Sequence, residues 1–428
     1  MKSLLPVTPF LICAAVACRA LAQDSAPPPS PAPSATPQVK MSITVDTDSN
    51  QKTAIDWAHD GAMALSKNDY DTAITDFSEA IKLDPDNKLK ATIYNDRGSA
   101  HGFKNETDKA IADFSEAVLD DPNLAEAWCN RACALEATGQ HEKAMADFAE
   151  SMRVKPDFAL AWYYRGRILL ERGETGKALD DLNHAVDLAL DNAAIRDARG
   201  NAYERKGDYD KAMADYSDSI GIDSGYVKAY YDRGNAFASK GKFTEALDDL
   251  SEMIFLAPGA PFAYLSRGLV YEKQGEHDKA IADFNQALQL DPKDLDAYVS
   301  RATSYDNKAD YQKSLDDLNT ALGIDAKSPP VLNNLSWFMA TCTEDDMRDG
   351  RKSVSYALQA CELSQWQDPG FVDTLAAAYA ENGDFDNAVK LEQKVLTYPN
   401  LDENFTGEAK ARIALYQGHK PYREKKKP

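Results

Sequence analysis

The sequence has 428 residues, with 48 basic and 69 acidic side chains and a formal net charge of −21. This acidic balance argues against a nucleic-acid-binding protein, which presents basic side chains to phosphates, and against broad electrostatic docking on anionic lipid. The six histidines are scattered singly, and no Ser-His-Asp order, HExxH motif, glycine-rich phosphate loop or metal-binding cysteine spacing occurs. We therefore predict a protein that is not an enzyme, with no catalytic residues, no metal ligands and no cofactor.

Residues 1–22 are typical of a secretory signal peptide. Lys2 is followed by an apolar run from Leu4 to Ala17, which is too short to span a bilayer. Ala20 and Ala22 are the small residues that a signal peptidase reads, so cleavage is predicted after Ala22. The sequence thus predicts an exported protein, most simply in a bacterial periplasm, with outer-membrane association or an extracellular location as alternatives, and no membrane span.

A lipoprotein signal is the rival interpretation of the same segment, with a lipid anchor at Cys18. Ala15 argues against it, because leucine is preferred at that position. The mature chain is expected to begin with a linker rich in proline, alanine and serine over residues 23–53, since such a composition buries no core. Four cysteines remain beyond the signal, too few for a disulfide framework, and they are expected to be small buried thiols: Cys129, Cys133, Cys342 and Cys361.

From Ala54 onward, six positions recur about every 34 residues. They are first occupied by Trp57, Gly61, Ala73, Phe77, Ala80 and Pro85, and next by Tyr94, Gly98, Ala110, Phe114, Ala117 and Pro122. This period and pattern resemble the tetratricopeptide repeat (TPR), which implies an all-α, right-handed superhelical solenoid of antiparallel helix pairs. About ten units and a C-terminal capping helix are predicted: eight regular repeats over 54–326, two divergent repeats over 327–400, and the capping helix with a basic tail over 401–428.

Each repeat is predicted to contain two helices of about 13 residues. Gly or Asn stands just past the first helix in eight repeats, where a left-handed residue closes a helix: Asn68, Asn105, Gly139, Gly173, Gly207, Gly241, Gly275 and Gly383. In the ninth repeat a longer loop is expected over 343–350, and the capping helix over 404–417. Segments of the last 100 residues, among them 332–342, 373–379 and 418–424, resemble a C-terminal module of bacterial TPR proteins. The basic residues of the tail, among them Lys420 and Arg423, are interpreted as a frayed end.

Two charged columns run through the regular repeats. Arginine occupies one position of the first helix (97, 131, 165, 199, 233, 267 and 301), and aspartate one position of the second (76, 113, 147, 181, 215, 249, 283 and 317). An arginine ladder for an anionic ligand is one interpretation, and structural ion pairs are the other. We favour ion pairs, because both positions become apolar or aromatic together in the last two repeats. Pairing within a repeat is preferred, although Asp60 replaces the first arginine and Asp76 could instead meet Arg97.

The remaining first-helix positions of repeats four to six carry the richest set of donors and aromatic side chains on this acidic chain. We predict that they bind a protein or peptide partner on the concave face: Tyr163, Tyr164, Arg167, Asn201, Arg205, Lys228, Tyr231 and Asn235. A solvated face is the alternative, and Lys228 with Asn235 matches only part of the carboxylate clamp found in some TPR families. The resemblance implies a protein-interaction scaffold or adaptor of the bacterial cell envelope, or alternatively an outer-membrane-anchored lipoprotein with a structural or assembly role.

Overall fold

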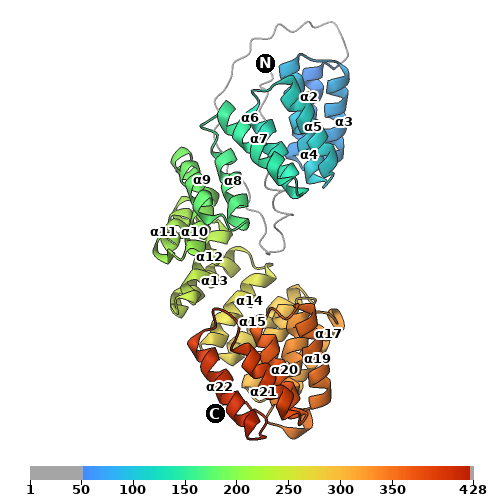
Figure 1. Cartoon of the computed structure of the whole chain (residues 1–428). Coiled ribbons are helices and arrows are strands. Elements are labelled where there is room, and N and C mark those ends of the chain that lie inside the picture. Colours follow the sequence, from blue (N-terminus) through green and yellow to red (C-terminus); the bar gives the residue numbers. More distant parts are fainter. Residues whose placement is uncertain (1–51, 425–428) are drawn as a thin grey trace. The chain divides into compact units, whose positions relative to one another are not determined.

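The computed structural model describes residues 52–424, and within that range the regular structure is entirely helical (Figure 1). Two compact units divide the chain between Ala236 and Phe237, inside helix α12 (Val227–Ser239). Besides the first part of α12, the described part of the first unit contains α2 (Ala54–Ser66), α3 (Tyr70–Lys82), α4 (Asn87–Phe103), α5 (Thr107–Asp120), α6 (Ala125–Ala137), α7 (His141–Val154), α8 (Ala159–Glu171), α9 (Thr175–Leu188), α10 (Ala193–Lys206) and α11 (Tyr209–Ile222).

The second unit continues the same alternation of helices. After the end of α12 it contains α13 (Phe243–Leu256), α14 (Pro261–Lys273), α15 (His277–Leu290), α16 (Leu295–Asn307), α17 (Tyr311–Ile324), α18 (Pro329–Thr341), the 3₁₀ helix η1 (Asp345–Met347), α19 (Gly350–Leu363), α20 (Pro369–Glu381), α21 (Phe385–Val395) and α22 (Glu403–Gln417). The loop predicted over 343–350 therefore holds one 3₁₀ turn, and the predicted last helix is α22.

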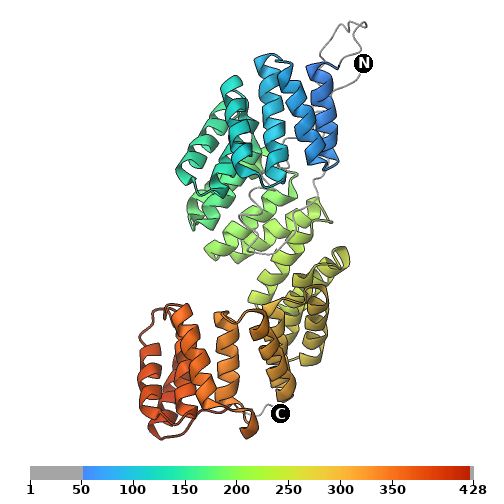
Figure 2. The same ribbon diagram turned by 90° about the vertical axis from the view of Figure 1, so that its right-hand side faces the viewer.

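Consecutive helices pair as antiparallel hairpins, each an α-helical repeat (Figure 2). In the first unit α2, α4, α6, α8 and α10 are first helices. Each of the first four also contacts the first helix of the next repeat, and α10 is hydrogen-bonded to α12. In the second unit the first helices are α14, α16, α18 and α20, and α14, α16 and α18 each contact the next one. The close approach of first helices creates one continuous face in each unit, and we call it the first-helix face.

Helix ends follow the predicted turn chemistry. The eight predicted Gly and Asn positions all have positive φ, between 60° and 84°. The same position of the eighth repeat carries Ala309, at φ 57°. An alanine is strained in this conformation because its Cβ crowds the backbone, so this turn lacks the residue that would suit it best.

The core of each repeat lies where its two helices cross. The alanines at the crossing, such as Ala144 and Ala246, are fully buried. Glycine allows the closest approaches: a Cβ on Gly268 would lie 2.5 Å from Cε1 of Phe284, and one on Gly200 would lie 2.6 Å from Cε1 of Tyr216. Small residues at these positions are therefore required by packing, as the sequence pattern predicted.

Helix α4 is longer than the predicted first helices, with 17 residues. The first and second occurrences of the pattern, at Trp57 and Tyr94, are 37 residues apart rather than 34. The three additional residues extend the start of α4, where the Asp86 carboxylate accepts hydrogen bonds from the backbone N–H groups of Lys88 and Leu89 at 3.1 Å. The insertion therefore lengthens one helix and leaves the pairing of α4 with α5 intact.

Candidate functional site

The arginine column is a set of structural ion pairs. In six repeats Nε and Nη2 of the arginine both donate to the aspartate of the same repeat, at 2.6 to 2.9 Å: Arg97–Asp113, Arg131–Asp147, Arg165–Asp181, Arg199–Asp215, Arg267–Asp283 and Arg301–Asp317. These aspartates are buried. The prediction of pairing within a repeat is therefore confirmed. A guanidinium that makes two hydrogen bonds to a buried carboxylate does not serve as a binding site for anionic ligands.

Five of these arginines, all except Arg165, also link their repeat to the one before it. Nη1 donates to a serine or asparagine on the preceding second helix, for example from Arg97 to Ser78 at 3.0 Å and from Arg199 to Asn183 at 3.2 Å. On the second helix that precedes Arg165, the equivalent position carries Ala149, whose side chain has no hydrogen-bond acceptor. This link between repeats was not predicted, although the serine or asparagine that recurs at this position of the second helix was its signal in the sequence.

The first repeat has Asp60 at the arginine position, and a lysine from outside the repeat pattern, Lys52, supplies the positive charge there. Lys52 Nζ lies 2.7 Å from Oδ2 of Asp60, and the attraction of Asp60 and Asp76 raises the pKa of the ammonium group. Arg97 is committed to Asp113, so the alternative pairing of Arg97 with Asp76 is wrong.

The eight predicted partner-binding residues lie on three consecutive first helices of the first unit. Tyr163, Tyr164 and Arg167 are on α8, Asn201 and Arg205 on α10, and Lys228, Tyr231 and Asn235 on α12. Arg205 is exposed, and all the others except Tyr164 are half-buried. We call the seven accessible residues the α8–α12 patch.

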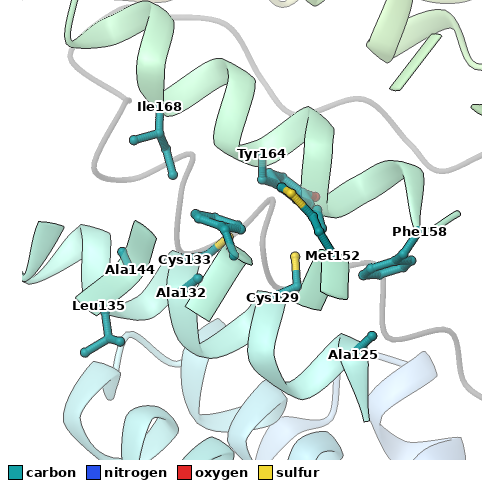
Figure 3. Close-up of a cluster of buried hydrophobic side chains, with 12 residues drawn as sticks. Ala125, Cys129, Ala132, Cys133, Leu135, Ala144, Met152, Phe158, Tyr164 and Ile168 are labelled. Atoms are coloured by element: carbon teal, nitrogen blue, oxygen red, sulfur yellow. The ribbon is translucent and has the colours of Figure 1, made fainter. Parts of the chain in front are cut away.

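Tyr164 belongs to the core instead. It is 5% exposed and packs in one cluster with Cys129, Cys133 and Met152, where Figure 3 shows it. Consecutive residues of a helix point about 100° apart, so Tyr163 and Tyr164 face different surroundings. Tyr164 faces the preceding repeat. Only Tyr163 of the two reaches the patch.

A hydrogen-bonded polar network joins α10 to α12. Lys228 forms ion pairs with Asp232 and with Asp197, whose Oδ2 is 2.8 Å from Nζ. Asn201 Nδ2 donates to Asp232 Oδ2 at 3.0 Å, and its Oδ1 lies 2.8 Å from the hydroxyl of Tyr216. Lys228 and Asn201 are therefore held in place by neighbouring repeats before any partner arrives.

Asp197 is the most deeply buried charged group of this network, at 2% exposure. Its Oδ1 accepts no hydrogen bond within residues 52–424. Burial, opposed by the attraction of Lys228, raises the pKa of this carboxyl to about 7. Burial alone would lower the pKa of the Lys228 ammonium, but Asp197 and Asp232 outweigh burial and raise it. The network thus carries a titratable proton near neutral pH.

Two arginines complete the patch. The Arg167 guanidinium lies over the Tyr163 ring, 5.6 Å from its centroid, with Nη1 3.4 Å from the Tyr163 hydroxyl. Arg205 Nη1 donates to the carbonyl of Leu170 on α8 at 2.8 Å. A guanidinium carries five N–H donors in a planar fork. The arrangement can donate to carboxylates and backbone carbonyls and can offer aromatic contact area.

Metal sites, disulfides and membrane-spanning helices each require a particular arrangement of residues. Residues 52–424 contain no group of three or more His, Cys, Asp or Glu side chains placed to hold a metal ion. Cys129, Cys133, Cys342 and Cys361 are buried, as predicted. Within the same range no helix has the length and apolar character that crossing a bilayer requires. The predicted signal peptide and Cys18 lie outside the described residues.

Comparisons with known proteins agree with this architecture. Models of the tetratricopeptide repeat match residues 61–87, 125–158 and 261–294, and a TPR repeat model matches 200–241. No curated protein sequence matches the chain. The paired helices and their close-packed small residues define an α-helical repeat protein. The matched segments are tetratricopeptide repeats, and the chain is a TPR protein over these segments.

Several solved structures resemble the chain at low sequence identity and with TM-scores below 0.5. A TPR protein of Parabacteroides merdae is 18% identical with a TM-score of 0.47, covering 59% of this chain and 98% of that chain. The APC/C hetero-tetramer Cut9–Hcn1 is 15% identical with a TM-score of 0.48, and the match covers 84% of this chain and 83% of that chain. YrrB, described as a TPR protein with an unusual peptide-binding site, is 20% identical with a TM-score of 0.36. The match covers 43% of this chain and 95% of that chain.

Proposed function

We propose that this TPR protein is a non-enzymatic scaffold or adaptor of the bacterial cell envelope and binds protein or peptide partners through the α8–α12 patch. The observation that carries the proposal is the polar network across three consecutive repeats, in which Lys228, Asn201 and Arg205 are all fixed by neighbouring helices. Side chains that are already ordered lose little entropy when a partner binds, so they favour recognition.

The chemistry of the patch indicates the kind of segment that it would take. Arg167 and Arg205 offer guanidinium donors on a chain whose net charge is −21. Such donors match backbone carbonyls and carboxylates, and Tyr163 and Tyr231 supply rigid contact area beside them. An extended segment that carries an acidic side chain fits these groups best.

The proposed envelope location rests on the signal peptide predicted for residues 1–22. Export would place the mature chain outside the cytoplasm, where a scaffold meets other exported proteins. The alternative, a lipoprotein anchored in the outer membrane through Cys18, follows from the same leader. Mass spectrometry of the mature N-terminus separates the two: a chain that begins at Gln23 supports a periplasmic scaffold, and a diacylglyceryl-cysteine supports the lipoprotein.

Capture of partners from the native envelope tests the binding function. The perturbation is a triple variant with Arg167→Ala, Tyr231→Ala and Asn235→Ala. We expect this variant to lose the captured partners, because anchors of an interface are few and enriched in tyrosine and arginine. The helix-crossing core is untouched, so the melting temperature should remain within about 3 °C of the unaltered protein, the shift that corresponds to about 1 kcal/mol or less.

A matched control carries three alanines on second helices of the same unit, at Lys177, Asp180 and Asp210, which are exposed. This control should capture the full set of partners. If the patch variant also captures the full set, the patch is a solvated face and the proposal is wrong.

A further inference from the structure

The last described residues fold back onto the first-helix face of the second unit. After α22 the chain turns at His419, which has φ 54°, and residues 420–424 run without regular secondary structure. Trp337 Nε1, on α18, donates to Oε1 of Glu424 at 2.6 Å, and the backbone N–H of Glu424 donates to the Thr341 carbonyl at 3.0 Å. Residues 418–424, which we call the tail, thus lie against the first helix of the ninth repeat.

Arg423 joins this tail to two first helices at once. Its Nη2 lies 2.5 Å from Oε2 of Glu381, the last residue of α20, and its Nη1 donates to the Ala340 carbonyl of α18 at 3.2 Å. The prediction that this part of the basic tail is frayed is therefore wrong for Arg423. The last carbonyls of a helix have no partner inside it, so Ala340 and Thr341 offer acceptors that an incoming segment can use.

Tyr422 fills an aromatic position beside the same helix. Its ring centroid lies 5.8 Å from that of Trp337, and the guanidinium of Arg412 is 5.6 Å from the Tyr422 centroid and 5.8 Å from that of Trp337. Arg412 is 3% exposed and its Nη2 makes no hydrogen bond within residues 52–424. A buried cation beneath two rings favours an aromatic ligand side chain, because the ring face is negative.

The contacts of the tail are those of a bound peptide. Three successive side chains each meet a complementary group: Tyr422 meets a cation and a ring, Arg423 a carboxylate, and Glu424 an indole N–H. All three remain half-exposed. The end of the repeat stack is covered by α22, whose Ala409 and Tyr416 are fully buried in the core, so capping alone does not require this polar recognition.

We propose that the first-helix face of α18 and α20 is a binding site for a partner segment with an aromatic–arginine–acid sequence, and that the chain's own tail occupies it until such a partner arrives. This site is distinct from the α8–α12 patch and does not rest on the function proposed for it. Glu424 also lines a polar hollow with Asp306 and Asn307 of α16, the preceding first helix. A partner segment longer than the tail therefore meets further polar groups beyond the acidic position.

The tail competes with a partner through its tether. A short tether gives an effective concentration of about 1 mM, so a tail whose free peptide has a Kd of about 100 μM would weaken the apparent affinity of a competing segment about tenfold. Removal of the tail should therefore expose the site, and the free tail peptide should refill it.

Fluorescence anisotropy with a labelled peptide, Gly-His-Lys-Pro-Tyr-Arg-Glu, tests the proposal. We expect this peptide to bind a chain that ends at Gln417 and to bind the intact chain about tenfold more weakly. A control peptide with alanine in place of Tyr and Arg should bind neither chain. Hydrogen exchange on α20 to α22 establishes that the shortened chain is folded.

A full-length variant with Arg423→Ala and Glu424→Ala keeps the tether and the capping helix, and decides the question if the shortened chain unfolds. This variant should bind the peptide at least threefold more tightly than the intact chain. Equal binding to the intact chain and this variant, no binding to a folded shortened chain, or equal binding of the control peptide would each overturn the proposal. A dimer of the intact chain in size-exclusion chromatography that Arg423→Ala abolishes would identify a second copy, rather than a partner protein, as the occupant and would also overturn it.

Discussion

A double-mutant cycle at Arg199 and Asp215 distinguishes a structural ion pair from a ligand-binding arginine. Nε and Nη2 of Arg199 donate to Asp215 at 2.8 and 2.6 Å, and Asp215 is 4% exposed. Arg199→Ala leaves a buried carboxylate without its partner, which costs about 3 kcal/mol. Asp215→Ala leaves a guanidinium that is partly solvated, which costs about 2 kcal/mol.

The double variant removes both charges and leaves no stranded charge. It should therefore cost about 3 kcal/mol, which is less than the sum of the two single losses. The coupling energy is then about 2 kcal/mol, the sum of the single losses minus the double loss. Hydrogen exchange read by mass spectrometry on α10 and α11 is the suitable assay, because a repeat protein opens locally and a single melting temperature averages over repeats.

A coupling energy below about 0.5 kcal/mol would refute the pairing, since such a value is within the error of additive effects. Asn183→Ala tests the additional bond from Arg199 Nη1 to the preceding repeat, and should cost about 1 kcal/mol. Ala149, which stands at the corresponding position before Arg165, provides the natural comparison.

Three further predictions follow from burial and backbone geometry. Ala144→Asp and Ala246→Asp each place an unpaired charge at a fully buried helix crossing, so circular dichroism should show a loss of several kcal/mol, and unaltered melts would contradict the packing described. Ala309→Gly should stabilise the eighth repeat by about 1 kcal/mol, measured as slower hydrogen exchange in α16 and α17, because glycine accepts φ 57° without strain; faster exchange would contradict this. The pKa of Asp197 is raised in the folded state, so between about pH 4 and 7 the folded state holds a proton that the unfolded state has lost. The free energy of unfolding should therefore fall as pH rises through this window, by at most about 1.4 kcal/mol per pH unit. Asp197→Asn should remove that part of the slope, and an unchanged slope in the variant would show that another group causes it.

The sequence pattern predicts the fold well because most of it is packing information. The period of 34 residues, the small residues at the crossings and the left-handed turn residues each specify a local geometry, and Gly200, Ala144 and Gly139 have the surroundings expected of them. The pairing of arginine with aspartate was predictable because the two positions change character together along the chain.

The finer features of the two sites depend on side-chain direction and on long-range contacts, which a repeat pattern does not encode. Tyr163 and Tyr164 are equivalent in composition, yet only the turn of the helix places Tyr164 in the core. Arg423 meets Glu381 across 42 positions of the chain, and Trp337 meets Glu424 across 87. A basic cluster at a chain end carries no signal for such contacts.

Site-specific photocrosslinking tests the central claim, that the first-helix face of repeats four to six binds a partner, most directly. A photoreactive p-benzoylphenylalanine replaces Tyr231 on α12 in one variant and Asp210, an exposed residue of the second helix α11, in another. We predict that irradiation of the native envelope gives a discrete adduct from the first variant and none from the second. Absence of an adduct at position 231, or the same adduct from both positions, would contradict the claim.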